Sequence, residues 1–364
     1  MSNLVRPHKY WLGVAIIVGL LTPSMLFGSQ VQAATIKDTK ATKVRIGFFA
    51  NVTHSPALVG QELGFFSKYL TKDNTSVEFI AFNAGPAAIE AMKAGAIDVT
   101  YIGPNPAING FSSTKGALLR IVAGSTSGGA ELVVKPSINS VKDLVGKKIA
   151  SPQLGNTQDV ALRSWLKTNG ITTTITGGGD VTVIPTENAQ SLALFQRGDI
   201  DGAWLPEPWS TRLVLEAGAK VLVDEKTLWP KGQFVTTHII ANTAFLNKYP
   251  ETVKSIISAH LDSLNYIVKS PVEAKDAVQK QIEKWTGKRL SDAVMTRAWQ
   301  NLKFTYDPIA SSLEKSAYDA VDVGVLTTLG SRGINGIYDV RILNSILKAQ
   351  KLKSVSVRGL GLTW

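Results

Sequence analysis

Short apolar runs of strand length alternate along this chain with longer segments in which apolar residues recur at helical spacing. The alternation predicts strands at 43–49, 77–82, 118–123, 131–135, 147–151, 181–184 and 236–241. Helices are expected at 56–63, at 157–168 and after Pro250, with Gly64 and Gly170 following the first two. We expect a polar loop at 124–129, where the chain would cross between lobes. This order of elements is typical of the α/β class.

One segment of this pattern occurs twice, at 91–103 and again at 194–206, with equivalent residues 103 positions apart. Each copy predicts a helix that ends at a glycine, a turn with an aspartate, and a buried strand that leads into a proline-containing loop. Two copies indicate two similar α/β lobes, each with a loop at a strand end, where open α/β sheets bind ligands. The alternative is a recurrent building block without functional meaning. If the copies face a cleft, Tyr101 and Trp204 are candidates for its opposite walls.

The N-terminal segment predicts export. Arg6 and Lys9 precede an apolar run, and Val31-Gln32-Ala33 offers small residues at a cleavage site. We therefore expect a signal peptide at 1–33, cleaved near Ala33, a flexible leader at 34–42 and a periplasmic location. The alternative is an uncleaved membrane anchor, because the run is close to the length that spans a bilayer.

Composition excludes several kinds of chemistry. The 364 residues contain no cysteine, which rules out disulfides, thiolate nucleophiles, zinc–thiolate sites and a lipid anchor on cysteine. The histidines beyond the signal peptide, His54, His238 and His260, are far apart, so we expect no metal site. His260, on the apolar face of a helix, is expected to be a core residue. Phosphate-binding and nucleophile motifs are absent, so the sequence predicts no cofactor and no enzymatic activity.

The chain is basic. Its net charge of +11 becomes +9 when Arg6 and Lys9 are removed with the signal peptide. Because the cations are dispersed and the protein is expected to be exported, we expect no nucleic-acid partner. Such a surface attracts small anions.

Polar loops before helices are the candidate binding elements. Ser55 precedes one helix, Asn156 to Gln158 begin another, and Ser127 to Gly129 can expose backbone N–H groups. The segment from Trp204 to Trp209 places Glu207 between two prolines and two indoles, and we expect Glu207 to brace the loop rather than contact the ligand.

Four motifs carry a family resemblance: Glu62-Leu63-Gly64-Phe65-Phe66, the Gly-x-Ile-Asp unit, the run from Val141 to Ala150, and Glu207-Pro208-Trp209. On these motifs the chain resembles the substrate-binding proteins of ABC importers, in the nitrate, sulfonate and taurine group. The resemblance implies a type II-like periplasmic binding protein fold, with a ligand cleft between a lobe of 43–128 plus 236–364 and a second lobe of 129–235.

The resemblance also implies a function and a site. The protein would capture a small organic anion, an aliphatic sulfonate, as a monomer and deliver it to a membrane permease. Its cleft would be lined by Asn51, His54, Ser55, Asn83, Tyr101, Gly103, Asn105, Ser127, Gly128, Asn156, Thr157, Gln158, Glu207 and Trp209. The alternatives are an enzyme of the same fold that acts on a thiamine-pyrimidine or menaquinone precursor, and an extracellular solute sensor.

Overall fold

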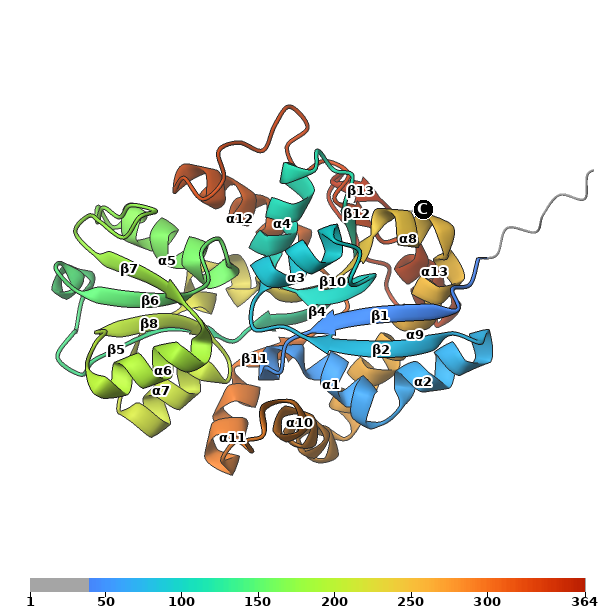
Figure 1. The fold of residues 1–364 in the computed structure, drawn as a ribbon, viewed down its shortest axis with the longest axis horizontal. Coiled ribbons are helices and arrows are strands. Elements are labelled where there is room, and N and C mark those ends of the chain that lie inside the picture. The colour runs from blue at the N-terminus through green and yellow to red at the C-terminus, as the bar shows by residue number, and fades with distance from the viewer. Residues whose placement is uncertain (1–38, 364) are drawn as a thin grey trace, which may run out of the picture. The chain divides into compact units, whose positions relative to one another are not determined.

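The computed structural model describes residues 39–363, and the predicted signal peptide and the first part of the leader lie outside these residues. Two β-sheets with helices around them make up the described chain (Figure 1). Each sheet contains both parallel and antiparallel strand pairs.

The first sheet has eight strands, in the order β13-β12-β4-β10-β3-β1-β2, and β11 also pairs with β4. The pairs β1–β2 and β1–β3 are parallel, whereas β10 runs antiparallel to both β3 and β4. The strands are β1 (Lys43–Phe48), β2 (Ser76–Ala81), β3 (Val99–Ile102), β4 (Leu119–Gly128), β10 (Val235–Asn242), β11 (Leu302–Phe304), β12 (Tyr338–Asp339) and β13 (Gly361–Leu362).

The second sheet has five strands, in the order β7-β6-β8-β5-β9. Strand β6 is parallel to β7 and β8, and β5 is antiparallel to β8 and β9. The strands are β5 (Ala130–Val134), β6 (Lys148–Pro152), β7 (Thr182–Thr186), β8 (Gly202–Pro206) and β9 (Lys220–Asp224).

Helices follow most of the strands, and several end in a glycine with positive φ, such as Gly198 and Gly218. Helices α1, α2, α9 and α10 pack together, and α3 and α4 pack against strands of the first sheet (Figure 1). The α-helices are α1 (Ser55–Glu62), α2 (Phe65–Leu70), α3 (Gly85–Lys93), α4 (Pro104–Ser113), α5 (Thr157–Thr168), α6 (Asn188–Arg197), α7 (Trp209–Ala217), α8 (Thr243–Lys248), α9 (Pro250–Lys269), α10 (Pro271–Thr286), α11 (Asp292–Gln300), α12 (Ala310–Asp322) and α13 (Arg341–Ala349). Short 3-10 turns are η1 (Val52–His54), η2 (Thr71–Asp73), η3 (Val141–Leu144), η4 (Glu225–Leu228) and η5 (Pro230–Gly232).

Helices cover both faces of the second sheet because its strands are apolar on both faces. Successive side chains of a strand point to opposite faces. Accordingly Leu132 and Val134 of β5 join one apolar cluster, while Val133 between them joins another. A strand buried on both faces reads as a continuous apolar run, which is why the sequence reveals these strands.

The sequence prediction was wrong at residues 124–129. We expected a loop there, but β4 continues to Gly128 and pairs with β10 and β11. Pairing with strands from distant parts of the sequence overrides the local turn preference. A side chain at Gly124 would lie 2.2 Å from the carbonyl oxygen of Asp307, so this glycine permits a close approach of backbones. Gly128 and Gly129, with φ of 79° and 73°, lie at the crossing from the first sheet to the second.

Other expectations agree with the structure. The helix at 157–168 has the predicted bounds, and the helix after Pro250 runs to Lys269. His260 on this helix is fully buried with both ring nitrogens hydrogen-bonded, which confirms that it is a core residue.

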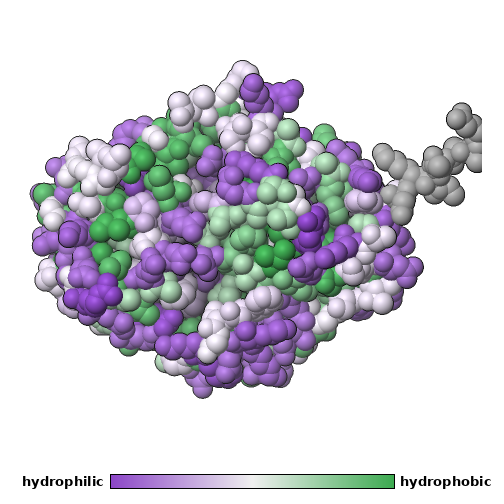
Figure 2. All heavy atoms as spheres, viewed as in Figure 1, coloured by the Kyte–Doolittle hydropathy of each residue, from purple (hydrophilic) through white to green (hydrophobic). Residues whose placement is uncertain are grey.

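Hydrophilic residues cover most of the face in Figure 2, around a patch of apolar residues near its middle. Within residues 39–363, no helix is both long enough and apolar enough to cross a membrane.

Candidate functional site

A small cavity of about 20 Å³ lies where strands of both sheets end and helices begin. We call it the inner cavity. Phe49 and Gly103 follow strands of the first sheet, and Pro206 ends β8 of the second. Ligands of open α/β sheets bind at such strand ends. The lining residues are Phe49, Asn51, Thr53, His54, Asn83, Gly103, Asn156, Thr157, Gln158, Asn188, Pro206, Thr236 and Thr237.

Four helices begin at the inner cavity. His54, Gly103 and Asn156 immediately precede α1, α4 and α5, and Asn188 is the first residue of α6. A helix N-terminus carries unpaired N–H groups and the positive end of the helix dipole. Four such ends around one cavity favour a bound anion.

None of the described residues that line the inner cavity is a lysine, arginine, aspartate or glutamate. An anion bound there meets no carboxylate that would repel it. It also meets no cationic side chain, so hydrogen bonds and helix dipoles would have to supply the attraction.

His54 is an uncharged donor in this cavity. Its Nδ1 accepts a hydrogen bond from the backbone N–H of Phe49 at 3.2 Å. Burial lowers the pKa of His54 to about 3, so the ring is neutral near pH 7. A neutral ring that accepts at Nδ1 carries its proton on Nε2. The side chain therefore offers an Nε2–H group for hydrogen bonding.

Three buried side-chain atoms of the cavity wall have no hydrogen-bond partner among the described residues. They are Oγ1 of Thr157, Oδ1 of Asn188 and Oγ1 of Thr237. The three side chains belong to residues that are 5%, 7% and 1% exposed. An unpaired buried polar group costs free energy, which a ligand in the cavity would recover by supplying the partner.

The structure brings seven of the fourteen predicted site residues to the inner cavity. These are Asn51, His54, Asn83, Gly103, Asn156, Thr157 and Gln158. Sequence reasoning missed Asn188, Thr236 and Thr237, among others. The repeat could have indicated two further lining residues, because Thr53 and Pro206 are 103 positions from Asn156 and Gly103.

Tyr101 and Trp204 do not form opposite walls of the cavity. Both are fully buried in central strands of their sheets. The hydroxyl of Tyr101 donates to Nδ1 of His260 at 3.0 Å, because Nε2 of His260 donates to the carbonyl oxygen of Gly124. The indole N–H of Trp204 donates to Oε2 of Glu225 at 2.8 Å. The two aromatic side chains are core residues because strands covered on both faces leave neither side open.

Four polar site candidates also lie outside the lining of the inner cavity, since their polar groups bond to the protein itself. The hydroxyl of Ser55 donates to the carbonyl of Val52, and the amide of Asn105 donates to the carbonyl of Ser316. The hydroxyl oxygen of Ser127 accepts from the N–H of Phe234, and the carbonyl oxygen of Gly128 accepts from Thr236.

Trp209 lies beside the inner cavity rather than in its lining. Its indole N–H donates to Oδ1 of Asn51 at 2.9 Å, so it orients one of the lining side chains. The guanidinium of Arg212 lies 4.8 Å from the centre of the Trp209 ring.

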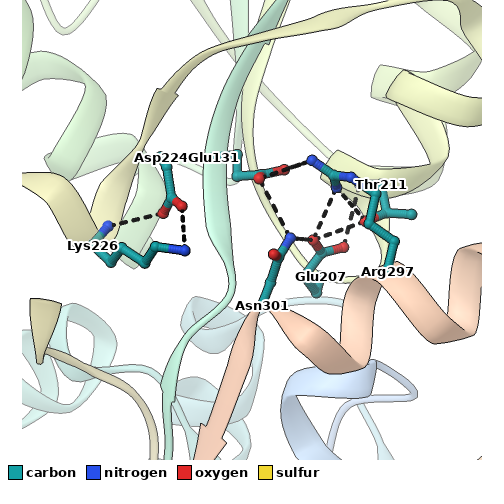
Figure 3. Close-up of polar contacts among 7 residues, drawn as sticks. All are labelled: Glu131, Glu207, Thr211, Asp224, Lys226, Arg297 and Asn301. Atoms are coloured by element: carbon teal, nitrogen blue, oxygen red, sulfur yellow. Dashed lines mark hydrogen bonds and ion pairs between the residues drawn. The ribbon is translucent and has the colours of Figure 1, made fainter.

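Glu207 is fully buried in a charge cluster that joins α11 to the second sheet (Figure 3). Arg297 lies between two carboxylates: its Nη2 is 2.9 Å from both oxygens of Glu131, and its Nη1 is 3.4 Å from Glu207. The amide of Asn301 and the hydroxyl of Thr211 donate to the same oxygen of Glu207, at 2.6 and 2.8 Å. These contacts agree with the expectation that Glu207 braces its loop.

Burial dominates the electrostatics of this cluster. It raises the pKa of Glu207, and together with the neighbouring charge of Glu207 it raises the pKa of Glu131 to about 7. Glu131 is two residues beyond Gly129, so the cluster lies beside the crossing between the two sheets.

The architecture is that of type II periplasmic binding proteins, as predicted. The periplasmic nitrate-binding protein of Synechocystis PCC 6803 has the same fold, with a TM-score of 0.71 and 16% identity over 87% of this chain and 92% of that protein. The alkanesulfonate-binding protein of Xanthomonas axonopodis pv. citri, solved with bound MOPS, matches with a TM-score of 0.66 and 19% identity. The match covers 80% of this chain and 96% of that protein.

The chain belongs to the NMT1-like family, whose model matches residues 37–282. It is 27% identical over 233 residues to the taurine-binding periplasmic protein of Escherichia coli (strain K12). These residues make up 64% of this chain and 69% of the relative. It is 24% identical over 247 residues to a putative aliphatic sulfonates-binding protein of Bacillus subtilis (strain 168), and the match covers 66% of this chain and 69% of the relative.

Proposed function

We propose that this chain is the substrate-binding protein of an ABC importer and that it captures a small organic anion in the inner cavity. The convergence of four helix N-termini on a cavity without a carboxylate carries the proposal. Relatives of similar length named for binding taurine and aliphatic sulfonates support it. The protein acts outside the cytoplasmic membrane as a monomer and delivers its ligand to a permease.

The anionic group in the inner cavity is a sulfonate, and the sequence prediction assigns it to an aliphatic sulfonate. A sulfonate has three oxygens that accept hydrogen bonds and stays ionised at physiological pH. The Nε2–H of His54 and the hydroxyls of Thr157 and Thr237 provide three donors, one for each sulfonate oxygen. Uncharged donors suit a strong-acid anion, since no proton has to be exchanged on binding.

Two lobes close over the ligand. The predicted boundaries assign 43–128 and 236–364 to one lobe and 129–235 to the other, and the crossing at Gly128 and Gly129 supports this division. Lining residues from the two sheets, such as Gly103 and Pro206, already border one cavity in this structure, as a closed form requires. The permease would recognise the closed form of the protein.

A thermal-shift screen tests the function. Methanesulfonate, taurine, nitrate and sulfate are compared with choline, a cation of similar size. A ligand at about 100 times its Kd adds about 2.7 kcal/mol to the free energy of unfolding. We expect a raised Tm with sulfonates and none with choline. Stabilisation by choline alone would refute the anion site, and chemical turnover of a stabilising ligand by the purified chain would refute the transport role.

A further inference from the structure

The inner cavity adjoins a larger groove. Asn51, Asn83 and Asn188 line both the inner cavity and an adjoining pocket of about 120 Å³. Trp209 and Trp285, with Asn83, line that pocket and also a further hollow of about 530 Å³. We call the two outer spaces together the outer groove. The inner cavity and the outer groove therefore adjoin at these shared side chains, where Asn51 bonds to Trp209 and Asn83 bonds to Glu187.

Two indole rings with fixed positions form part of the groove wall. The N–H of Trp209 donates to Asn51, and the N–H of Trp285 donates to Oε1 of Gln281 at 3.1 Å. The ring of Trp285 also packs edge-on against Phe48, with 5.1 Å between the ring centres. Rings held in this way lose little conformational entropy when a flat group packs on them.

The outer part of the groove is basic. Arg212, Lys288 and Arg289 line it, and Glu216, which pairs with Arg212 at 3.0 Å, is the acidic residue of this hollow. The surplus of positive charge favours anionic ligands at the entrance to the cavity. Glu187 lines the adjoining pocket, so the positive charge belongs to the outer hollow, while Trp209 and Trp285 supply aromatic surface to both spaces.

We propose that the ligand is an organic anion with an aromatic or heteroaromatic ring, whose ring lies in the outer groove against Trp209 and Trp285 while its anionic group lies in the inner cavity. This inference rests on the proposed function: it keeps the anionic group in the inner cavity and replaces the predicted aliphatic part of the ligand by a ring. A short alkyl sulfonate would leave both indoles in contact with water. A ring in the groove would bury apolar area and make aromatic contacts in addition to the head-group hydrogen bonds.

Three ligands with the same head group test the inference. Isothermal titration calorimetry on the full chain compares methanesulfonate, benzenesulfonate and 2-naphthalenesulfonate. The sulfonate contacts are common to all three, so differences in affinity report on the groove. We expect the two arenesulfonates to bind about tenfold tighter than methanesulfonate or better. Equal affinities, or tighter binding of methanesulfonate, would overturn the inference.

A pair of adjacent substitutions on α6 provides the control. Ala189 is exposed and lines the outer groove, whereas Gln190 is equally exposed but is not among the lining residues. Ala189→Phe should remove most of the preference for the arenesulfonates and leave methanesulfonate affinity within about threefold, because a phenyl group fills the space of the ligand ring. Gln190→Phe should retain the preference.

The outcomes separate the two proposals. An unchanged arenesulfonate preference in Ala189→Phe would overturn the assignment of the ring to this groove. Failure of all three sulfonates to bind the unaltered chain would instead overturn the proposed function, and the inference with it.

Discussion

The two copies of the repeated segment, residues 91–103 and 194–206, build the same local structure in two different sheets. In the first copy the N–H of Arg45 donates to Asp98, and the N–H of Asp98 donates back to the carbonyl of Arg45. In the second copy Lys148 and Asp201 exchange the same two hydrogen bonds. Arg45 and Lys148 are themselves 103 positions apart. The repeat therefore extends to the strands that begin each unit, well beyond the segment where the sequences look alike.

The equivalent aromatic residues also have equivalent roles. Tyr101 and Trp204 are both fully buried, and each donates a hydrogen bond to a buried titratable side chain, His260 or Glu225. The copies differ where their strands end. Gly103 leads directly into α4, while Pro206 leads into Glu207 and the charge cluster at the crossing. The comparison teaches that the repeat encodes the scaffold, and that the two copies diverge in the residues that follow each strand.

Truncation of the buried aromatic residues should have the largest effect. Tyr101→Ala and Trp204→Ala should each lower the free energy of unfolding by about 3–5 kcal/mol, because each leaves a cavity and an unpaired buried partner. Urea unfolding measures this loss. The milder Tyr101→Phe should cost about 1 kcal/mol and keep sulfonate affinity. If Tyr101→Phe lost sulfonate affinity and kept its stability, the hydroxyl of Tyr101 would have to contact the ligand, which would contradict its assignment to the core.

The partners of these aromatic residues should give opposite pH dependences. Burial raises the pKa of Glu225 from 4.5 to about 7 and lowers the pKa of His260 from 6.5 to about 4. The stability contributed by Glu225 is complete below pH 4.5 and is lost as the pH rises through 7. The contribution of His260 is present above pH 6.5 and is lost as the pH falls through 4. Each amounts to about 3 kcal/mol at most.

Glu225→Gln and His260→Gln separate the two contributions. Glu225→Gln keeps an acceptor for Trp204 and should gain stability relative to the unaltered chain between pH 5 and pH 8. His260→Gln should instead gain stability relative to the unaltered chain as the pH falls from 6.5 to 4. Urea unfolding across this range measures both differences. A Glu225→Gln curve parallel to that of the unaltered chain would show that this carboxyl does not titrate as stated.

The aspartates of the repeat should contribute moderately. Asp98→Ala and Asp201→Ala should each cost about 1–3 kcal/mol, since each removes a hydrogen bond to a strand N–H and an ion pair. The loss should be larger for Asp98, because Arg45 binds it through two side-chain nitrogens, whereas Lys135 makes one bond to Asp201. Asp276→Ala, at an exposed ion pair, is the control and should cost less than about 0.5 kcal/mol. A larger loss of stability for Asp201→Ala than for Asp98→Ala would contradict this account of the two copies.

The helix-ending glycines should show the smallest effect. Gly95 and Gly198 have φ of 69° and 82°, and a side chain at either would meet no atom within 4 Å. Gly95→Ala and Gly198→Ala should therefore each cost about 1 kcal/mol, from backbone strain alone. Thermal unfolding tests whether the two losses agree. A large difference would show that the copies hold their helix ends differently.

The sequence predicted the fold class and most elements because their signals are local. Gly95 and Gly198 marked helix ends, and Asn156 marked the start of α5, where its side chain accepts from the N–H of Thr157. The strand from 124 to 128 could not be predicted in the same way, since it is formed by pairing with β10 and β11, more than 100 residues away. Long-range pairing leaves no periodic pattern in so short a segment.

The site was predicted where loops lead into helices and missed elsewhere. His54 and Thr157 lie at helix N-termini, a position that sequence can reveal. Thr237 reaches the cavity from the interior of β10, where nothing in the sequence distinguishes it from a core threonine. The repeat predicted a buried strand around Tyr101, but it could not show that this side chain lies in the core rather than at a cleft, because that depends on the helices that cover both faces of the strand.

Binding of methanesulfonate to Thr157→Val, measured by calorimetry beside Thr168→Val, tests the central claim most directly. Both threonines lie on α5, but the hydroxyl of Thr157 is unpaired at the inner cavity, whereas that of Thr168 bonds to the carbonyl of Ser164 on an exposed turn. If uncharged donors hold the anion, we expect about tenfold weaker binding for Thr157→Val and unchanged binding for Thr168→Val. Equal affinity in both variants would contradict the assignment of the inner cavity as the anion site.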